Sequence, residues 1–176
     1  MSSRKIVLNK KSVFKGRILQ DVHLDTVLLP NGTKVQLECI RHPGAAAVVP
    51  FLSKDEIILI RQYRPVVDKY LWEIPAGTLK SGESPIRCAK RELKEEIGYT
   101  AHSIKYITHI YTTPGFANEC IYIYKGSHLK KVKVKPDTDE ILSVRNFTID
   151  KIRQMFKENK IIDAKTIAGL SACGII

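Results

Sequence analysis

The chain has 176 residues, of which 44% are hydrophobic and 27% are charged, and it carries a formal net charge of +11. This length suits one compact domain or one domain with a small addition, and the composition excludes a disordered chain. No apolar run approaches the roughly 18 residues of a membrane span, and charged residues interrupt the first 30 positions in a way that excludes a signal peptide. We therefore expect a cytoplasmic protein with no membrane partner.

The basic charge makes nucleic-acid binding a hypothesis to weigh. The densest cluster spans 125–135 and includes "KKVKVK", whose alternation is typical of the solvent face of an edge strand. We therefore expect no nucleic-acid partner, although the charge can steer anionic substrates. The cysteines are too widely spaced for a zinc site, and we expect buried free thiols at Cys39, Cys88, Cys120 and Cys173.

The first 40 residues predict a small antiparallel β-sheet. Apolar and polar side chains alternate along them, and Pro30–Gly32 supplies a turn between two runs. Such a sheet can hardly bury a core of its own, so it should pack against the rest of the chain or against a second subunit. We therefore divide the chain into residues 1–40 and a main domain over residues 41–176.

The main domain alternates strands and helices, which predicts an α/β layered fold. "AAAVVPFL" (45–52) and "EIILIRQY" (56–63) predict two buried strands. A helix should begin after the N-cap Ser84, with Pro85 at its first position, and should end at Gly98. The apolar stripe of this helix should comprise Ile86, Ala89, Leu93 and Ile97. The later elements should be strands at 104–111, 120–124 and 142–147, then helices at 149–158 and from about Asp163.

Three glutamates of this helix are the first sign of chemistry. Glu92, Glu95 and Glu96 stand at i, i+3 and i+4, so they share one face and repel one another. They also lie in the last turn, where the helix dipole disfavours anions. A divalent cation would compensate, and oxygen ligands suit Mg²⁺ or Mn²⁺. The helix alone leaves open an acidic end in solvent, balanced by cations at Lys90, Arg91 and Lys94.

The residues around this helix match a known family pattern. From Gly77 the sequence runs Gly77-x5-Glu83-x7-Arg91-Glu92-Leu93-x-Glu95-Glu96-x-Gly98-Tyr99. This pattern resembles the box of the Nudix hydrolase family at every defined position, with Tyr99 in place of the usual aliphatic residue. From average residue usage, a chance match somewhere in such a chain has odds on the order of one in a million.

The resemblance implies a fold and a metal site. The fold would be the Nudix α/β/α sandwich with a mixed sheet, here preceded by the small N-terminal antiparallel sheet. The site would hold two or three Mg²⁺ or Mn²⁺ ions, with Arg91 orienting the glutamates through charge-assisted hydrogen bonds and Glu83 pairing with Arg91. The implied metal ligands are Glu92 and Glu96, assisted by Glu95 and by the carbonyl of Ala76.

Stretches outside the box resemble one branch of the family. "RQYR" (61–64), "WEIPAG" (72–77) and "YTTPGFANE" (111–119) are similar to the ADP-ribose pyrophosphatases and nucleoside-diphosphate-sugar hydrolases. Pro114 stands fifteen residues past Tyr99, close to the position of a characteristic proline in ADP-ribose hydrolases. This branch usually works as a homodimer in which N-terminal strands meet across the interface, and residues 1–40 suit that arrangement.

The branch implies a set of substrate-binding residues, each with an ordinary structural alternative. These residues are Arg61, Arg64, Trp72, Glu73, Gly115 and Phe116. The two arginines could simply flank a strand end, and Trp72 could equally pack in the core or stack on the ligand. Glu73 resembles a ligand-contacting position, while the Gly115–Phe116 loop would face the terminal sugar or form a plain turn.

The catalytic base is expected in an acidic loop after the box. "PDTDEIL" (136–142) stands at that place, although Thr138 replaces a glutamate that the family pattern commonly has. Glu140 is the first choice as base or additional metal ligand, with an ordinary acidic turn as the alternative. Glu119 is the second choice for the base. With Glu92, Glu96 and Arg91, Glu140 completes the expected catalytic set.

The expected function is Mg²⁺-dependent hydrolysis of the diphosphate bond of ADP-ribose or a related nucleoside diphosphate sugar. The products would be a nucleoside monophosphate and a sugar phosphate. One alternative is a different substrate, such as GDP-mannose, a dinucleoside polyphosphate or an RNA 5′ end. Another is a catalytically idle module that binds a nucleotide or nucleic acid, although such a module has no need of the intact box.

Overall fold

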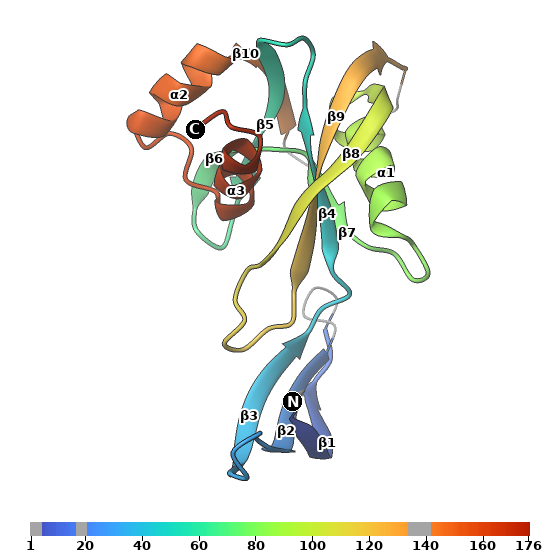
Figure 1. Cartoon of the computed structure of the whole chain (residues 1–176), viewed down its shortest axis with the longest axis vertical. Coiled ribbons are helices and arrows are strands. Elements are labelled where there is room, and N and C mark those ends of the chain that lie inside the picture. Colours follow the sequence, from blue (N-terminus) through green and yellow to red (C-terminus); the bar gives the residue numbers. More distant parts are fainter. Residues whose placement is uncertain (1–4, 17–20, 134–141) are drawn as a thin grey trace. The chain divides into compact units, whose positions relative to one another are not determined.

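The computed structural model describes residues 5–16, 21–133 and 142–176. Contacts within the chain define two compact units (Figure 1). The first unit contains Met1–Gly44 and Tyr111–Cys120, and the second contains Ala45–Ile110 and Ile121–Ile176. Within the described residues, no helix is both long and apolar enough to cross a membrane.

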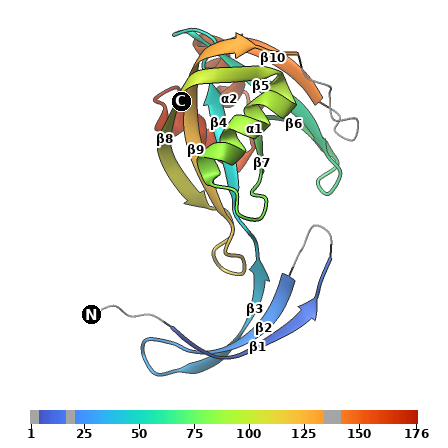
Figure 2. The same ribbon diagram turned by 90° about the vertical axis from the view of Figure 1, so that its right-hand side faces the viewer.

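The first unit contains the predicted N-terminal sheet (Figure 2). Its three antiparallel strands, in the order β1-β2-β3, are β1 (Ile6–Phe14), β2 (Asp21–Leu28) and β3 (Lys34–Arg41). The predicted turn joins β2 to β3, where Gly32 has φ 84° and its N–H donates to the Leu29 carbonyl at 2.9 Å. Every residue of β1 is exposed, and two register shifts interrupt its pairing with β2. Because the buried residues of the three strands are only Asp25 and Val27, this sheet has almost no core of its own.

The second unit contains two sheets. A mixed sheet has the order β7-β4-β9-β8, in which β4 runs parallel to β9 and antiparallel to β7. A second, antiparallel sheet has the order β10-β5-β6. The strands are β4 (Ala45–Pro50), β5 (Glu56–Arg64), β6 (Lys69–Glu73), β7 (Ala76–Thr78), β8 (Tyr99–Tyr111), β9 (Cys120–Lys131) and β10 (Leu142–Thr148).

Helices cover both faces of these strands, α1 on one side and α2 and α3 on the other (Figure 1). Their bounds are α1 (Pro85–Ile97), α2 (Ile149–Lys157) and α3 (Ala164–Ala172). The buried run of β4 explains the layers, because Ala45, Ala47 and Val49 join the core beneath α2 and α3. Ala46 and Val48 point the opposite way, into the core beneath α1. Burial on both faces accounts for an apolar run without alternation and confirms the predicted α/β/α sandwich.

The box helix α1 begins and ends as predicted. Pro85 is its first residue, and Gly98 ends it in the left-handed region with φ 72°. The predicted apolar stripe is wrong at Ile86, which is 39% exposed, because Cys88 is the residue buried in the first turn instead. Glu92 is buried as well, so the helix presents a carboxylate on its inner face.

The lysine-rich segment begins in the last part of β9. β9 lies between β4 and β8 in the sheet order, but its pairing with β4 ends at Gly126. Lys130 and Lys131 therefore follow the part of β9 that pairs with β4. Both are exposed, as predicted.

Candidate active site

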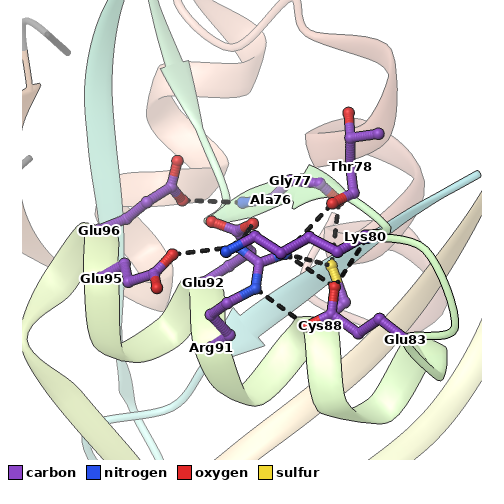
Figure 3. Close-up of polar contacts among 10 residues, drawn as sticks. All are labelled: Ala76, Gly77, Thr78, Lys80, Glu83, Cys88, Arg91, Glu92, Glu95 and Glu96. Carbon is purple, nitrogen blue, oxygen red and sulfur yellow. Dashed lines mark hydrogen bonds and ion pairs between the residues drawn. The ribbon is translucent and has the colours of Figure 1, made fainter.

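Arg91 is the centre of the polar network on α1. Its Nε and Nη2 donate to the two oxygens of Glu83 at 2.9 and 3.0 Å, so the pair is bidentate. Its Nη1 donates to Glu92 and, at 3.0 Å, to Glu95, and Nη2 also reaches the Thr78 carbonyl at 3.2 Å. Figure 3 shows Arg91 between Glu83 and Glu95, with the Ala76–Thr78 strand beside it. One guanidinium therefore holds three carboxylates and the loop before the helix.

These contacts shift the ionisation of the pair. The bidentate bond from Arg91 and the backbone N–H of Lys80 lower the pKa of Glu83 to about 2. The hydrogen bond to Glu83 in turn raises the pKa of Arg91 above its ordinary value. Both groups are therefore charged at neutral pH, which keeps the network intact under physiological conditions.

Gly77 and Glu92 are fitted closely together. A Cβ on Gly77 would lie 1.9 Å from Glu92 Oε1, so no other residue fits beside this carboxylate without a shift. The Cys88 thiol donates to the Gly77 carbonyl at 3.3 Å, and burial raises the pKa of Cys88 to about 11. This cysteine is therefore a packed thiol and not a nucleophile.

Glu96 lies next to β7. Its Oε2 accepts a hydrogen bond at 2.9 Å from the backbone N–H of Ala76, the residue just before the box. The last turn of α1 is thus tied to the strand whose Ala76 carbonyl is an expected metal ligand. Glu92, Glu95, Glu96 and Ala76 all come together around one end of this helix (Figure 3).

The residues present fit a hard divalent cation in their donor chemistry. Among the described residues, no three His, Cys, Asp or Glu side chains converge closely enough to hold a metal as they stand. Mg²⁺, however, is usually held by one or two carboxylates, with substrate phosphates and water completing its shell. The carboxylates of Glu92, Glu95 and Glu96 supply such ligands within one turn of α1.

Arg64 and Glu73 form a second network, on β5 and β6. Arg64 Nε and Nη2 donate to the two oxygens of Glu73 at 2.8 and 2.6 Å. Lys165 from α3 also pairs with Glu73, which is fully buried. Although burial alone would raise the pKa of Glu73, the Arg64 hydrogen bonds and the Lys165 charge hold it below its ordinary value. The Glu73 carboxylate, which is expected to contact the ligand, is thus paired with the side chains of Arg64 and Lys165.

Arg61 and Trp72 lie side by side on the same pair of strands. The Arg61 guanidinium is 4.8 Å from the centre of the Tyr70 ring and 6.0 Å from that of Trp72. Trp72 meets Phe147 edge to face, with 4.9 Å between ring centres, and packs partly buried against the core. Arg61 itself remains exposed, so it is accessible to a ligand. Trp72 packs against the core on at least one face of its ring.

The expected Gly115–Phe116 loop belongs to the first unit. It lines a pocket of about 290 Å³. The other lining residues are Lys5, then Leu37, Cys39, Ile40 and Arg41 of β3, then Tyr111 at the end of β8, and Pro114, Ala117 and Asn118 from the same loop. Glu119 is in this unit too, where it accepts a hydrogen bond from Thr112 at 2.6 Å and lies 3.6 Å from His42. Glu140, the first choice for the base, lies outside the described residues.

Comparison with known proteins places the chain in a family. A model of the NUDIX domain matches residues 41–170. A relative from Bacillus methanolicus, named methanol dehydrogenase activator, is 38% identical over 91% of this chain and 87% of its own length. The ADP-ribose pyrophosphatase of Bacillus subtilis is 37% identical over 89% of this chain and 85% of its own.

More distant proteins agree with these matches. The ADP-ribose pyrophosphatase of Mycobacterium tuberculosis is 32% identical over 84% of this chain and 73% of its own length. A crystal structure described as an ADP compounds hydrolase has the same fold, with a TM-score of 0.83 and 23% identity over 97% of this chain and 92% of that one. The chain therefore belongs to the NUDIX domain family.

Proposed function

We propose that this protein is a Mg²⁺-dependent hydrolase of ADP-ribose or a related nucleoside diphosphate sugar. It would cut the diphosphate bond and release a nucleoside monophosphate and a sugar phosphate. The observation that carries the proposal is the complete carboxylate set of α1, held in place by Arg91 and by the Ala76 N–H. Relatives named ADP-ribose pyrophosphatase at 37% and 32% identity support the substrate class.

The residues of this chain would divide the work as follows. Glu92 and Glu96, assisted by Glu95 and the Ala76 carbonyl, would hold two or three Mg²⁺ or Mn²⁺ ions. Bound there, the metal would supply charge neutralisation at the diphosphate and would lower the pKa of a water molecule. Arg91 would hold the carboxylates of Glu92 and Glu95 in their orientations, because its guanidinium donates a hydrogen bond to each of them. Glu140 would take the proton from the attacking water, with Glu119 as the second choice.

Substrate binding would fall to the basic and aromatic residues near these carboxylates. Arg64 and Arg61 would bind the diphosphate. The charge of Glu96 contributes to the raised pKa of Arg64, which supports a position of Arg64 near the carboxylates of α1. Trp72 would flank the ligand and Glu73 would act beside Arg64. In the first unit, Gly115 and Phe116 would shape the loop that faces the terminal sugar, and their pocket of about 290 Å³ supports a binding role.

The protein would work as a homodimer formed through residues 1–40. The support is β1, which exposes five apolar side chains: Ile6, Val7, Leu8, Val13 and Phe14. Exposed apolar side chains in this number on an edge strand are costly in water and are usually covered. A cytoplasmic location stays a prediction from the sequence.

The test is a turnover screen with Mg²⁺ on wild type and on Glu96→Gln. The panel holds ADP-ribose, GDP-mannose, UDP-glucose, NADH, a diadenosine polyphosphate, a dNTP and capped RNA, with products resolved by chromatography. We expect ADP-ribose or another nucleotide sugar to dominate and to yield a nucleoside monophosphate. Activity on dNTPs or RNA alone would reject the substrate class while keeping the metal helix.

For Glu96→Gln we expect turnover to fall by several orders of magnitude, because a metal ligand is lost. The fold should survive, since the amide oxygen of Gln can still accept the Ala76 N–H. Glu158→Gln, which changes a carboxylate at the end of α2, is the matched control and should keep wild-type turnover. A Glu96→Gln enzyme with near wild-type kcat would contradict the metal assignment.

A second candidate function is the regulation of another enzyme. The relative from Bacillus methanolicus is named as the activator of a dehydrogenase, so the same scaffold is associated with control of a partner enzyme. Absence of turnover across the whole panel, in folded wild-type protein, would favour this candidate over hydrolysis.

A further inference from the structure

Lys165 is a buried lysine that the box chemistry does not use. Its side chain is only 10% exposed, and Nζ contacts Glu73 and, at 3.1 Å, Asp163. Glu73 has no exposed surface and is also the bidentate partner of Arg64. Two cations and two carboxylates thus form one balanced network between β5, β6 and the start of α3. Burying a lysine costs desolvation free energy, so the position of Lys165 needs an explanation.

The start of α3 also holds the backbone that leads into the box. The Asp163 carboxylate caps the helix by accepting the Thr166 N–H at 3.0 Å and its hydroxyl at 2.6 Å. The same Thr166 hydroxyl accepts the Ile74 N–H at 2.9 Å. Two residues further on, Ala76 donates to Glu96. Residues 73–76 are therefore fastened to α3 on one side and to α1 on the other.

This network restrains the side chain of Arg64. One edge of its guanidinium, formed by Nε and Nη2, is bonded to the two oxygens of Glu73, yet the side chain is still 41% exposed. Its raised pKa comes from the Glu73 hydrogen bonds first, with smaller contributions from the charges of Asp163 and Glu96. An arginine fixed in this way pays little conformational entropy when it binds a phosphate. If Glu73 had only Arg64 as a partner, both side chains could turn together towards solvent.

We propose that Lys165 is a positioning residue: by fixing Glu73 it holds the Arg64 guanidinium in the orientation that binds the substrate diphosphate. The diphosphate part rests on the proposed function. Glu73 on this account acts through Arg64 and does not contact the ligand. The competing account is that Lys165 merely stabilises the fold, and it predicts a lower Tm with no change at Arg64.

The first experiment follows Arg64 directly, without any ligand. Solvent exchange of the Arg64 Nε proton is measured by ¹⁵N NMR, with the signal assigned by its loss in Arg64→Lys. Lys165→Met should speed the exchange at least about tenfold, because the Glu73 acceptor becomes mobile. Lys160→Met is the matched control: Lys160 is in an ion pair with Glu158 but its side chain is 59% exposed. It should leave the Arg64 signal unchanged.

The second experiment measures binding of ADP-ribose by calorimetry in EDTA, so that no turnover occurs. Lys165→Met should raise Kd about tenfold in the wild-type background. In an Arg64→Ala background the same change should have almost no further effect, because Lys165 acts only through Arg64. Additive effects of the two substitutions would overturn the proposal.

The two experiments separate the possible failures. Wild type that does not bind ADP-ribose would count against the proposed substrate, while Arg64 proton exchange would still decide whether Lys165 positions that side chain. Unchanged exchange in a folded Lys165→Met protein overturns the positioning role. If Lys165→Met does not fold, Lys165→Gln replaces it in both experiments, because its neutral amide keeps a polar group at this place but lacks the charge and the reach with which Lys165 fixes Glu73. Faster exchange in that variant supports the proposal, and wild-type exchange rejects it.

Discussion

Gly77 is required because of a side chain fifteen positions away. The Glu92 carboxylate fills the space where a Cβ would stand, at 1.9 Å. Glycines of this kind are easily attributed to backbone flexibility, but the φ of Gly77 is not positive. Its role is therefore to leave room for a proposed metal ligand.

For Gly77→Ala we expect a destabilisation of about 1–3 kcal/mol, the usual cost of overpacking. Turnover should fall as well, because Glu92 must move. The free energy of unfolding is measured in urea, and activity is followed during a Mg²⁺ titration. Glu92→Asp shortens the crowding side chain by one methylene, so Gly77→Ala should cost less stability in that background. An equal cost in both backgrounds would show that Glu92 is not the obstacle.

Pairing between distant side chains is also decided at the residue scale, and the sequence does not reveal it. Glu73 and Arg64 stay predicted substrate-binding residues, and the motif does not show that Glu73 pairs with both Arg64 and Lys165. Lys165 is separated from Glu73 by 92 positions, and no local periodicity connects them. The N-cap at Asp163 marks the start of α3 without indicating which residues the helix start contacts.

At the scale of elements, the box is a loop and a helix joined by one ion pair. Glu83 lies in the loop before α1 and Arg91 lies in the middle of the helix, and their bidentate contact closes the unit. The Lys80 N–H adds a hydrogen bond to the same carboxylate at 3.0 Å. The loop is therefore held to the helix by charge and not by apolar contacts alone.

This pair predicts an acid-sensitive element. The pKa of Glu83 is about 2 in the folded chain, below its ordinary 4.5, so its stabilising effect is complete above about pH 4.5. That effect is lost progressively as the pH falls from 4.5 towards 2. In urea unfolding between pH 6 and 3, wild type should therefore lose stability faster than Glu83→Gln. Parallel pH profiles for the two proteins would mean that the Glu83–Arg91 pair contributes nothing.

Element boundaries were predictable where they rest on local chemistry. Pro85 fixes the first turn of α1, Gly98 supplies the left-handed residue that ends it, and Asp163 caps α3. Prediction failed where a neighbouring element decides, as at Ile86 and Cys88. Either could face inward from periodicity, and packing against β4 and β5 selects Cys88. The Ser84 side chain, although at the N-cap, makes no capping bond.

For the whole molecule, the exposed apolar side chains of β1 predict self-association. Ile6 is 59% exposed and Phe14 55% exposed, and neither contributes to a buried core. The Ile6→Asp, Phe14→Asp double variant should therefore stay folded but shift from dimer to monomer. Size-exclusion chromatography with light scattering gives the mass directly. Val66→Asp is the control, since Val66 is 99% exposed on the β5–β6 turn of the other unit.

Two results would contradict the dimer. A wild-type protein with the mass of a monomer would reject the dimer itself. A double variant that keeps the dimeric mass would reject β1 as its interface. In the second case, another surface would hold the subunits together. A control variant that also dissociates would point to a general effect of added negative charge.

The ionic contacts of Arg64, Glu73, Lys165 and Asp163 have a consequence for temperature. Hydration of charged groups becomes less favourable on heating, so the penalty for burying the charges of Glu73 and Lys165 declines. Apolar burial gains no comparable advantage at high temperature. The relative strength of this network therefore grows in the warm range, and Arg64 should remain ordered close to the temperature at which the chain unfolds as a whole.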